Sequence, residues 1–374
     1  MKIVYFILNS FDIDSRARLE VAALGEMGHK IEIIATVGSE SQSYLGFPIH
    51  RLPQWSQPTR KFRFAQYNIL AARLARKISP DICHAVDLDT LQAAVRAAQR
   101  VGAKVVYEAR ELYTELEALA GRPRIQAIWR NLEAKLIAKA NKVFTINHSI
   151  AAELSSRYGI AEPPVVRNVA PLSQSLKPLD LHKLFEFPKS RKLLIYQGVL
   201  RKGQGLMMLL EIMRHVPDEI ALVIVGSGPE ESALKSHVRI SGLQSRVKFA
   251  GRVDPADLLN YTAGADAGLL LMEDVALNNR LALPQKLFQY LMAGIPQIVS
   301  PMPEISSFVK TEKTGLVIEP SDPEVAASSI VRFLSDESAL SEIKYNCRVS
   351  AEINNWDVES QKLREIYNSL EIKR

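Results

Sequence analysis

The sequence has little cysteine and no long hydrophobic run. Its 374 residues include only Cys83 and Cys347. Two cysteines so far apart support neither a disulfide framework nor a cysteine-based zinc site, and they favour a reducing, cytoplasmic location. The apolar run at residues 3–8 ends at Asn9, which makes it too short for a signal sequence or a membrane-spanning helix. We therefore expect a cytoplasmic protein whose first segment is a buried strand.

Acidic residues are missing from one segment of an otherwise mixed-charge chain. The net charge is +6, from 47 Lys and Arg against 41 Asp and Glu. Through residue 170 the count is 23 basic and 16 acidic residues, so the excess belongs to the first part of the chain. Six basic residues and no acidic one lie from Arg60 to Lys77, beside Phe62, Phe64 and Tyr67.

A basic helix that carries aromatic side chains can lie on an anionic membrane surface. It can equally be an ordinary helix with a solvated basic face. The segment from Arg60 to Lys77 thus predicts peripheral association with the inner face of a membrane, with the ordinary helix as the alternative. No zinc spacing, helix-turn-helix pattern or aromatic RNA-binding signature accompanies the charge, so we expect no nucleic-acid partner.

Predicted strands and helices alternate almost throughout the chain. The first series has strands at residues 2–8, 31–36, 81–84, 104–107 and 142–145, with helices at 16–27, 90–101 and 124–140. Residues 170–190 lose this periodicity, contain three prolines and are typical of a linker. The second series has strands at 193–196, 221–225, 247–250, 267–271, 297–300 and 316–318, with helices at 205–213, 230–241, 255–261 and 283–292.

Strands that are separated by crossover helices form parallel sheets covered on both faces. We therefore predict an α/β protein of two doubly wound, Rossmann-like domains, residues 1–170 and 171–355. Ligands of such sheets bind outside the carboxyl ends of the strands, so we expect the two domains to meet across a ligand-binding cleft.

Two glycine-rich segments follow buried strands of the second domain. The first, residues 223–230, contains Gly226 and Gly228. The second, residues 196–205, contains Gly198, Gly203 and Gly205 with Arg201 and Lys202. Glycine lets backbone N–H groups approach a phosphate, and the basic pair suits a diphosphate. The alternatives are a tight strand-to-helix turn for the first segment and a solvated basic loop for the second.

Residues 282–299 have the pattern of a helix that ends before a buried strand. Pro284 takes the predicted first helical position, and Leu287 belongs to the apolar face at helical spacing. Lys286 and Gln289 then lie near the amino end of the helix, toward the cleft. On spacing alone, a plain buried helix with two solvated polar residues is the favoured interpretation.

This segment resembles the nucleotide-sugar signature of the family 4 glycosyltransferases of GT-B fold, which reads Leu-Pro-Asn-Lys-Leu-Phe-Glu-Tyr-Met-Ala-Ala-Gly-x-Pro-Val-Val. Further segments resemble the family in the same order along the chain. They are Asp14-Ser15-Arg16 with residues 23–29, Asp81 to Leu91, Tyr107 to Glu115, Asn168-Val169 and Asn355-Trp356. The last resembles the start of a terminal helix, here about residues 356–374, that packs back on the first domain.

The resemblance implies a retaining glycosyltransferase that needs no metal and no cofactor beyond a UDP- or GDP-linked sugar donor. The second domain would bind the donor, and the first a glycan, polysaccharide or lipid-linked acceptor. The implied donor-binding residues are Gly198, Arg201, Lys202, Gly226, Gly228, Arg252, Val253, Pro284, Lys286, Leu287 and Gln289. The implied acceptor-side residues are Asp14, Arg16 and Asp87. The catalytic candidates are His84, Arg110 and Glu111, although His84 can equally be a hydrogen-bonded core residue.

Four donor positions depart from the family pattern. Gln289 replaces the glutamate that bonds the ribose, Leu281 its partner carboxylate, Gln204 a basic residue, and Val199 an arginine. Glutamine still bonds a hydroxyl but lacks the charge of a carboxylate. The basic pair of the glycine loop, with the unchanged Lys286, would then hold the diphosphate.

Val86 and Arg110 replace two histidines of the family pattern. Arginine does not act as a general base because it stays protonated in proteins, although it can hold a phosphate or carboxylate bidentately. These departures leave two hypotheses open. The first is an active glycosyltransferase with a shifted donor or acceptor, and the second is a catalytically inactive homologue that serves as a binding or regulatory subunit of an active partner.

Overall fold

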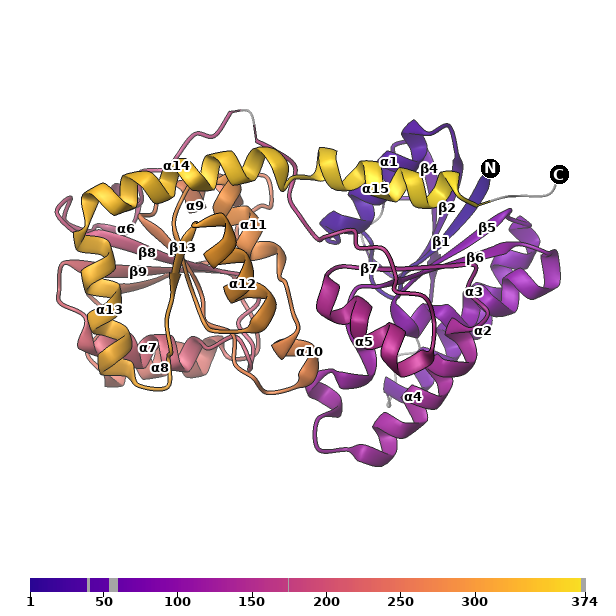
Figure 1. The fold of residues 1–374 in the computed structure, drawn as a ribbon, viewed down its shortest axis with the longest axis horizontal. Helices are drawn as coiled ribbons and strands as arrows, with labels where there is room; N and C mark the ends of the chain where they lie inside the picture. Colours follow the sequence, from indigo (N-terminus) through magenta and orange to yellow (C-terminus); the bar gives the residue numbers. More distant parts are fainter. Residues whose placement is uncertain (39–40, 54–59, 174, 371–374) are drawn as a thin grey trace. The chain divides into compact units, whose positions relative to one another are not determined.

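The computed structural model describes residues 1–38, 41–53, 60–173 and 175–370. The chain divides into two structural units (Figure 1). Unit 1 consists of Met1–Asn168 with Val358–Arg374, and unit 2 of Val169–Asp357. The sequence places its boundaries close to these, after residues 170 and 355; which ligand each unit binds stays a prediction.

Unit 1 is built on a seven-stranded sheet in the order β3-β4-β2-β1-β5-β6-β7. The strands are β1 (Lys2–Phe6), β2 (Lys30–Thr36), β3 (Ser43–Tyr44), β4 (Phe47–Leu52), β5 (Ile82–Val86), β6 (Lys104–Ala109) and β7 (Lys142–Thr145). Only β3 and β4 pair antiparallel; the other neighbours run parallel. The strand order reverses between β1 and β5, and ligands of doubly wound sheets bind at the carboxyl ends of strands at such a point.

Helices cover both faces of this sheet (Figure 1). They are α1 (Ser15–Glu26), α2 (Arg60–Ile78), α3 (Asp87–Val101), α4 (Pro123–Ile137), α5 (His148–Tyr158) and α15 (Trp356–Asn368), with short 3₁₀ turns at Tyr113–Glu115 and Glu117–Leu119. Helix α1 starts at Asp14, whose carboxylate accepts the backbone N–H of Ala17 at 2.9 Å. Helix α3 ends at Gly102 in the left-handed conformation, a common helix stop.

Helix α2 contains the predicted basic segment. Tyr67 is buried and donates its hydroxyl to the carbonyl of Ile34, and Phe64 packs edge-on against Trp129. Exposed basic side chains follow on the outer face, at Arg63, Arg73, Arg76 and Lys77. The side chains of residues 60–62 lie outside the described part of the structure. The geometry matches an ordinary crossover helix with a solvated basic face, the alternative left open by the sequence, and membrane association stays a prediction.

Unit 2 has a fully parallel six-stranded sheet in the order β10-β9-β8-β11-β12-β13. The strands are β8 (Lys192–Gln197), β9 (Ile220–Val225), β10 (Val247–Gly251), β11 (Ala267–Leu270), β12 (Gln297–Val299) and β13 (Gly315–Val317). This is the strand order of Rossmann-type sheets, and its reversal falls between β8 and β11. The predicted fold class, two doubly wound α/β domains, is therefore confirmed for both units.

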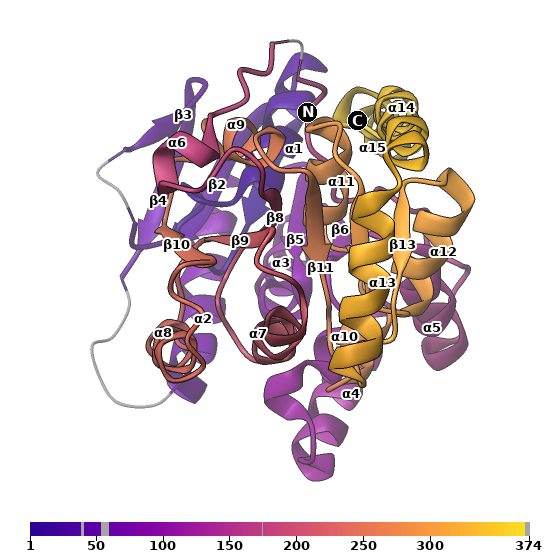
Figure 2. The same cartoon turned by 90° about the vertical axis from the view of Figure 1, so that its left-hand side faces the viewer.

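Nine helices are described in unit 2 between residues 175 and 357. They are α6 (Leu181–Phe185), α7 (Leu206–His215), α8 (Glu231–Ile240), α9 (Leu258–Ala263), α10 (Leu277–Arg280), α11 (Gln285–Met292), α12 (Pro303–Glu312), α13 (Pro323–Ser335) and α14 (Glu337–Ile353). Helices α7 and α8 lie on one face of the sheet, and α9, α11 and α14 lie on the other (Figures 1 and 2). Alternate residues of β8 and β9, such as Leu194 and Leu222, join α7, α8 and α13 in one apolar core.

Some elements differ from their predicted bounds. Pro284, the predicted first helical residue, precedes α11 with an extended backbone (φ −76°, ψ 149°), because proline's fixed φ suits extended as well as helical chain. Helix α3 begins at Asp87 rather than Thr90, directly after β5. Helices α12 to α14 have no counterpart among the predicted elements, although Asp322 and Asp336 cap α13 and α14 with their carboxylates.

Candidate functional site

The candidate site of unit 2 is built around the carboxyl end of β8, beside the reversal of strand order. Glycines let three loops pack backbone against backbone there. A Cβ at Gly205 would stand 1.7 Å from the carbonyl oxygen of Leu271, and one at Gly226 1.9 Å from that of Gly198. The N–H groups of Gly198 and Gly226 donate to Val225 and Gly251 at 2.9 and 2.7 Å. These two amides are therefore used within the fold, and the tight-turn alternative accounts for Gly226.

Lys286, on the first turn of α11, lies over Gly198. A Cβ at Gly198 would stand 3.4 Å from the lysine Nζ. The ammonium donates to Gln204 Oε1 at 2.6 Å and to the Tyr196 hydroxyl at 3.1 Å, and it lies 4.4 Å from the centre of the Tyr196 ring. Burial, with a smaller contribution from the positive charge of Arg201, lowers the pKa of Lys286 to about 7. Lys286 is thus not the solvated side chain that spacing alone favours.

Gln289 lies one turn further along α11 and is held by a second glutamine. Gln197 Nε2 donates to Gln289 Oε1 at 2.7 Å, and the Thr262 hydroxyl donates to Gln197 Oε1 at 2.5 Å. Because its oxygen is the acceptor in this chain, Gln289 has its Nε2 donors left to offer to a ligand hydroxyl. Gln197 and Thr262 were not predicted, because neither residue type stands out at the end of a strand or within a short helix.

The other predicted donor residues differ in exposure. Arg201, Lys202 and Arg252 have exposed side chains, whereas Val253 and Pro284 are half-buried. Leu287 is fully buried in the core, so its side chain supports α11 and does not reach a ligand. The structure thus places Lys286 and Gln289 on one helix that faces the glycine loop.

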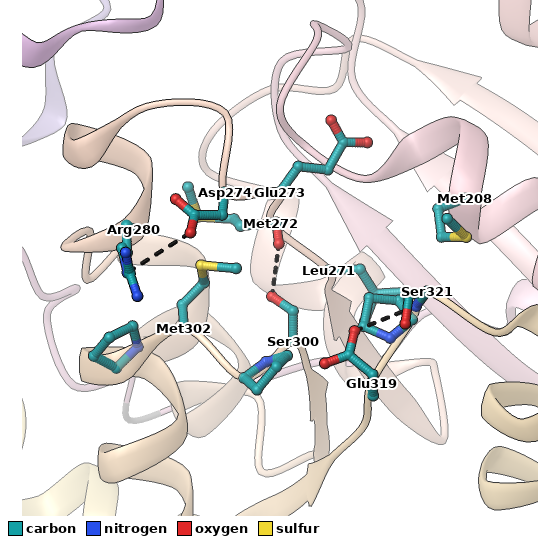
Figure 3. A pocket seen from close by; sticks show the side chains of 13 residues that line it. Met208, Leu271, Met272, Glu273, Asp274, Arg280, Ser300, Met302, Glu319 and Ser321 are labelled. Carbon is teal, nitrogen blue, oxygen red and sulfur yellow. Dashed lines mark hydrogen bonds and ion pairs between the residues drawn. The ribbon is translucent and has the colours of Figure 1, made fainter.

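A pocket of about 430 Å³ opens at the carboxyl ends of β11, β12 and β13 (Figure 3). Its walls are largely apolar and include Met208, Leu271, Met272 and Met302. Acidic side chains also line it, at Glu273, Asp274 and Glu319, and Arg280 lies 3.6 Å from Asp274. Negative charge repels phosphate, so this lining disfavours a diphosphate. The pocket was not predicted, because its lining comes from separate loops without a motif.

In unit 1, the predicted catalytic and acceptor-side residues meet in a buried network at β1, β5 and β6. Arg110 contacts both Asp14 oxygens at 3.0 Å and Glu108 at 2.9 Å. Arg16 contacts Glu108 at 2.6 Å and Glu20 at 2.9 Å. Arg110 thus sits among carboxylates, which suits a positioning role, and it does not act as a base.

His84 is part of the same network. Its side chain is 0% exposed, with Nδ1 2.6 Å from the Tyr367 hydroxyl and Nε2 3.3 Å from Glu108. Burial lowers the pKa of His84. Of the two interpretations that the sequence leaves open, the geometry matches the hydrogen-bonded core residue.

Glu20, His84 and Glu108 bring their donor atoms close enough to hold a metal ion. Their carboxylates, however, already pair with two guanidinium groups, those of Arg16 and Arg110. The guanidinium groups already pair with the negative charge that would otherwise attract a metal cation. The network therefore has the composition of an internal ion-pair cluster.

Asp87 lies at the carboxyl end of β5 with φ +57°, a left-handed conformation that is uncommon for a residue other than glycine. Its carboxylate accepts the backbone N–H groups of Arg110 and Glu111 at 2.8 and 3.3 Å. Burial, followed by the charge of Glu111, raises the pKa of Asp87 well above its usual range. Burial also raises the pKa of nearby Asp89 to about 7. Asp89 was not among the predicted residues, and its place two residues after Asp87 at a strand end was the available signal.

Comparison with known proteins assigns the chain to a family. A model of the "Glycosyl transferase 4-like domain" matches residues 13–169, and a model of "Glycosyl transferases group 1" matches residues 180–349. The chain belongs to the family 4 glycosyltransferases. A curated relative, the GDP-mannose-dependent monoacylated alpha-(1-6)-phosphatidylinositol monomannoside mannosyltransferase of Corynebacterium glutamicum, is 29% identical over 181 residues, 46% of this chain and 45% of the relative. The chain spans less than half the length of the curated relatives that it matches.

Solved structures of glycosyltransferases resemble this family 4 chain over nearly its whole length. Sucrose-phosphate synthase of Thermosynechococcus elongatus aligns with a TM-score of 0.81 at 17% identity, over 98% of each chain. Anabaena HepE, solved with UDP-glucose, aligns with a TM-score of 0.79 at 16% identity, over 99% of this chain and 100% of HepE. At such low identity, the structural likeness establishes the fold alone, and that fold is GT-B. Among the described residues, no helix combines the length and apolar character that crossing a membrane requires.

Proposed function

We propose that the chain is a glycosyltransferase that moves a sugar, with retention, from a UDP- or GDP-linked donor to a glycan or lipid-linked acceptor. The observation that carries this proposal is Lys286, a cation that contacts only neutral groups beside the strand-order reversal of unit 2. No described carboxylate lies within ion-pair distance of its ammonium. A partly buried basic group without a counter-charge favours an anionic ligand, and a diphosphate supplies one.

The geometry suggests a division of labour within the donor site. Lys286 would contact the diphosphate, and its charge would stabilise the negative charge that develops as the diphosphate leaves. Arg201 and Lys202, on the exposed glycine loop, would add attraction from solvent. Gln289 would donate its Nε2 hydrogens to a ribose hydroxyl, in an orientation fixed by Gln197.

In unit 1, Asp14, Asp87 and Glu111 would form the acceptor side, at the carboxyl ends of strands β1, β5 and β6. Arg110 holds the first two: its guanidinium pairs with Asp14 and its backbone N–H bonds Asp87. Asp89, whose pKa near 7 suits proton transfer at neutral pH, would assist them. We propose no metal ion for either side.

A lipid-linked acceptor would place the protein at the inner face of a membrane, within the cytoplasm. The matched relative from Corynebacterium acts, by its name, on a phosphatidylinositol mannoside. The exposed basic residues of α2 supply the charge that anionic headgroups would attract. Together these two observations favour a lipid-linked over a soluble glycan acceptor.

One observation favours a second candidate function, a catalytically inactive subunit of an active homologue. Arg110 stands where the family pattern has a histidine, and its guanidinium is taken up by Asp14, Tyr5, Glu20 and Glu108. In the active alternative, acceptor activation would fall to the neighbouring carboxylates.

Transfer and hydrolysis measured across UDP-, GDP- and ADP-sugars distinguish the two candidates. We expect turnover with one donor class, and a loss of about a hundredfold in Lys286→Met, because one electrostatic contact to a developing anion contributes roughly that much. Lys310→Met, on the exposed side of α12, is the matched control and should keep wild-type rates. Binding without turnover, or neither binding nor turnover with any nucleotide sugar, would contradict the active enzyme and favour the inactive subunit.

A further inference from the structure

The described hydrogen-bond and ring contacts of Lys286 are all with neutral groups. Its ammonium touches the amide oxygen of Gln204 and both the ring and the hydroxyl of Tyr196. Burial raises the pKa of Tyr196, so this phenol carries no charge near neutral pH. The charged group that acts on Lys286 is Arg201, and its positive charge also disfavours the ammonium form.

Gln204 is fixed in place by the glycine loop around it. The residues on either side, Gly203 and Gly205, have φ values of +75° and +69°. Gly205 rests against the carbonyl of Leu271, and the Gly203 carbonyl accepts the N–H of Glu273 at 3.1 Å. The Gln204 side chain is 7% exposed, and its amide oxygen points at Lys286. The loop therefore presents an acceptor at one defined place above Gly198.

A neutral acceptor at this place has a chemical consequence that a carboxylate would not have. An amide oxygen bonds the ammonium without cancelling its charge, so the cost of burying that charge remains. The pKa of Lys286 near 7 is the result, and a large share of the lysine is an uncharged amine at pH 7.5 and above. A diphosphate that arrives beside the amine reverses this balance, because an adjacent negative charge favours the protonated form.

We propose that Gln204 is a positioning residue that holds Lys286 over Gly198 as a proton-accepting amine, so that binding of a sugar nucleotide takes up a proton. This inference rests on the proposed function, since it concerns the same diphosphate. Gln204 makes no contact with the ligand in this account and acts through Lys286. The exposed Arg201 and Lys202 add further attraction for the diphosphate.

Calorimetric titration with UDP-glucose and GDP-mannose between pH 6 and 8.5 tests the inference. The phosphates of these diesters have no proton that titrates in this range, so any proton taken up belongs to the protein. Linkage requires affinity to fall as pH rises, because the bound state holds more protons than the free state. From a free pKa near 7, we expect a loss of about 30-fold from pH 6 to 8.5, and uptake of about three-quarters of a proton at pH 7.5 in buffers of different ionisation enthalpy.

Three variants test whether the pH dependence of binding comes from Lys286 and Gln204. In Gln204→Glu, a carboxylate pairs with Lys286 and keeps it protonated, so we expect affinity to become flat up to pH 8.5 and weaker at pH 6, where the carboxylate competes with the diphosphate. Lys286→Met should bind weakly and without pH dependence. Gln244→Glu, on an exposed loop of the same unit, introduces the same charge and should behave as wild type.

Each outcome decides one point. Nucleotide-sugar binding that stays flat with pH in the wild type, with no buffer dependence, overturns the proton linkage and leaves the proposed function standing. A wild-type pH profile in Gln204→Glu overturns the role of Gln204. Absence of binding for both sugar nucleotides at every pH removes the proposed donor site and the inference with it.

Discussion

Two buried glutamates of unit 1, Glu20 and Glu108, have pKa values shifted in opposite directions, although both contact Arg16 and Arg110. Burial, followed by the charge of Glu108, raises the pKa of Glu20 above its usual range. Burial also opposes ionisation of Glu108, but the charges of Arg110 and Arg16 outweigh it and hold its pKa well below the usual range. The positive charges of the two arginines are therefore balanced mainly by Glu108 and Asp14.

This difference predicts unequal effects of two isosteric substitutions. Glu20→Gln replaces a carboxyl whose ionisation is opposed by burial with an amide of similar shape, and it should lower the free energy of unfolding by about 1 kcal/mol or less. Glu108→Gln removes the anion shared by two buried guanidinium groups and should cost about 3–5 kcal/mol. Urea denaturation of both variants at pH 7 measures the difference. Equal losses, or a larger loss in Glu20→Gln, would contradict the assigned ionisation.

Only part of the proposed donor site could be predicted from the sequence. The sequence singled out Lys286 and Gln289 because the segment around them resembles a known signature. It could not predict the contact between Gln204 and Lys286, which are 82 positions apart and meet because a loop after β8 packs beside α11. Nor could it predict that Gln197 and Thr262 hold Gln289, since that contact depends on which side chains share a strand end.

At the scale of elements, two turns of unit 2 contain a left-handed glycine, one between β8 and α7 and one between α8 and β10. Gly205 and Gly242 have the same φ of +69°, but they differ in surroundings. A Cβ at Gly205 would stand 1.7 Å from the Leu271 carbonyl oxygen, whereas one at Gly242 would meet nothing within 4 Å. Comparing substitutions at Gly205 and Gly242 therefore separates two contributions to the free energy of unfolding: the penalty of the left-handed conformation and the penalty of the close approach to Leu271.

Alanine at each position should show both costs. Gly242→Ala should lower the free energy of unfolding by about 1–2 kcal/mol, the penalty of the left-handed region for a residue with a Cβ. Gly205→Ala should cost about 1–3 kcal/mol more, because the loop must shift away from Leu271, and it should weaken sugar-nucleotide binding by moving Gln204. Thermal unfolding followed by circular dichroism, with nucleotide-sugar titration of both variants, measures this. A loss in Gly205→Ala no larger than in Gly242→Ala would contradict the account.

The sequence predicted most elements because each is a run with one clear period. β7 at residues 142–145 has its predicted bounds, and β9 and α1 begin one residue earlier than predicted. Pro284 shows the limit of local rules, since proline's φ fits the end of an extended segment as well as the start of a helix. The surroundings of α11, which the sequence does not contain as a pattern, decide between the two.

At the scale of the whole molecule, both units use the same strand order around a central reversal. In unit 1 the reversal lies between β1 and β5, and in unit 2 between β8 and β11. Alternating strands and helices predicted this architecture, because parallel strands need crossover helices. The sequence could also predict that ligand-binding residues follow these strands. It could not predict that the unit 1 residues would be tied into a buried ion-pair network, which depends on three strands and α1 meeting at one point.

The central claim is that the diphosphate of a sugar nucleotide binds at Lys286, on the glycine-loop side of unit 2. A crystal structure of the chain with UDP-glucose or GDP-mannose tests it most directly. We predict a phosphate oxygen about 3 Å from Lys286 Nζ and a ribose hydroxyl in hydrogen-bond range of Gln289 Nε2. A nucleotide sugar ordered elsewhere would contradict the claim, for example in the pocket at the carboxyl ends of β11 to β13 with Lys286 still bonded to Gln204 and Tyr196.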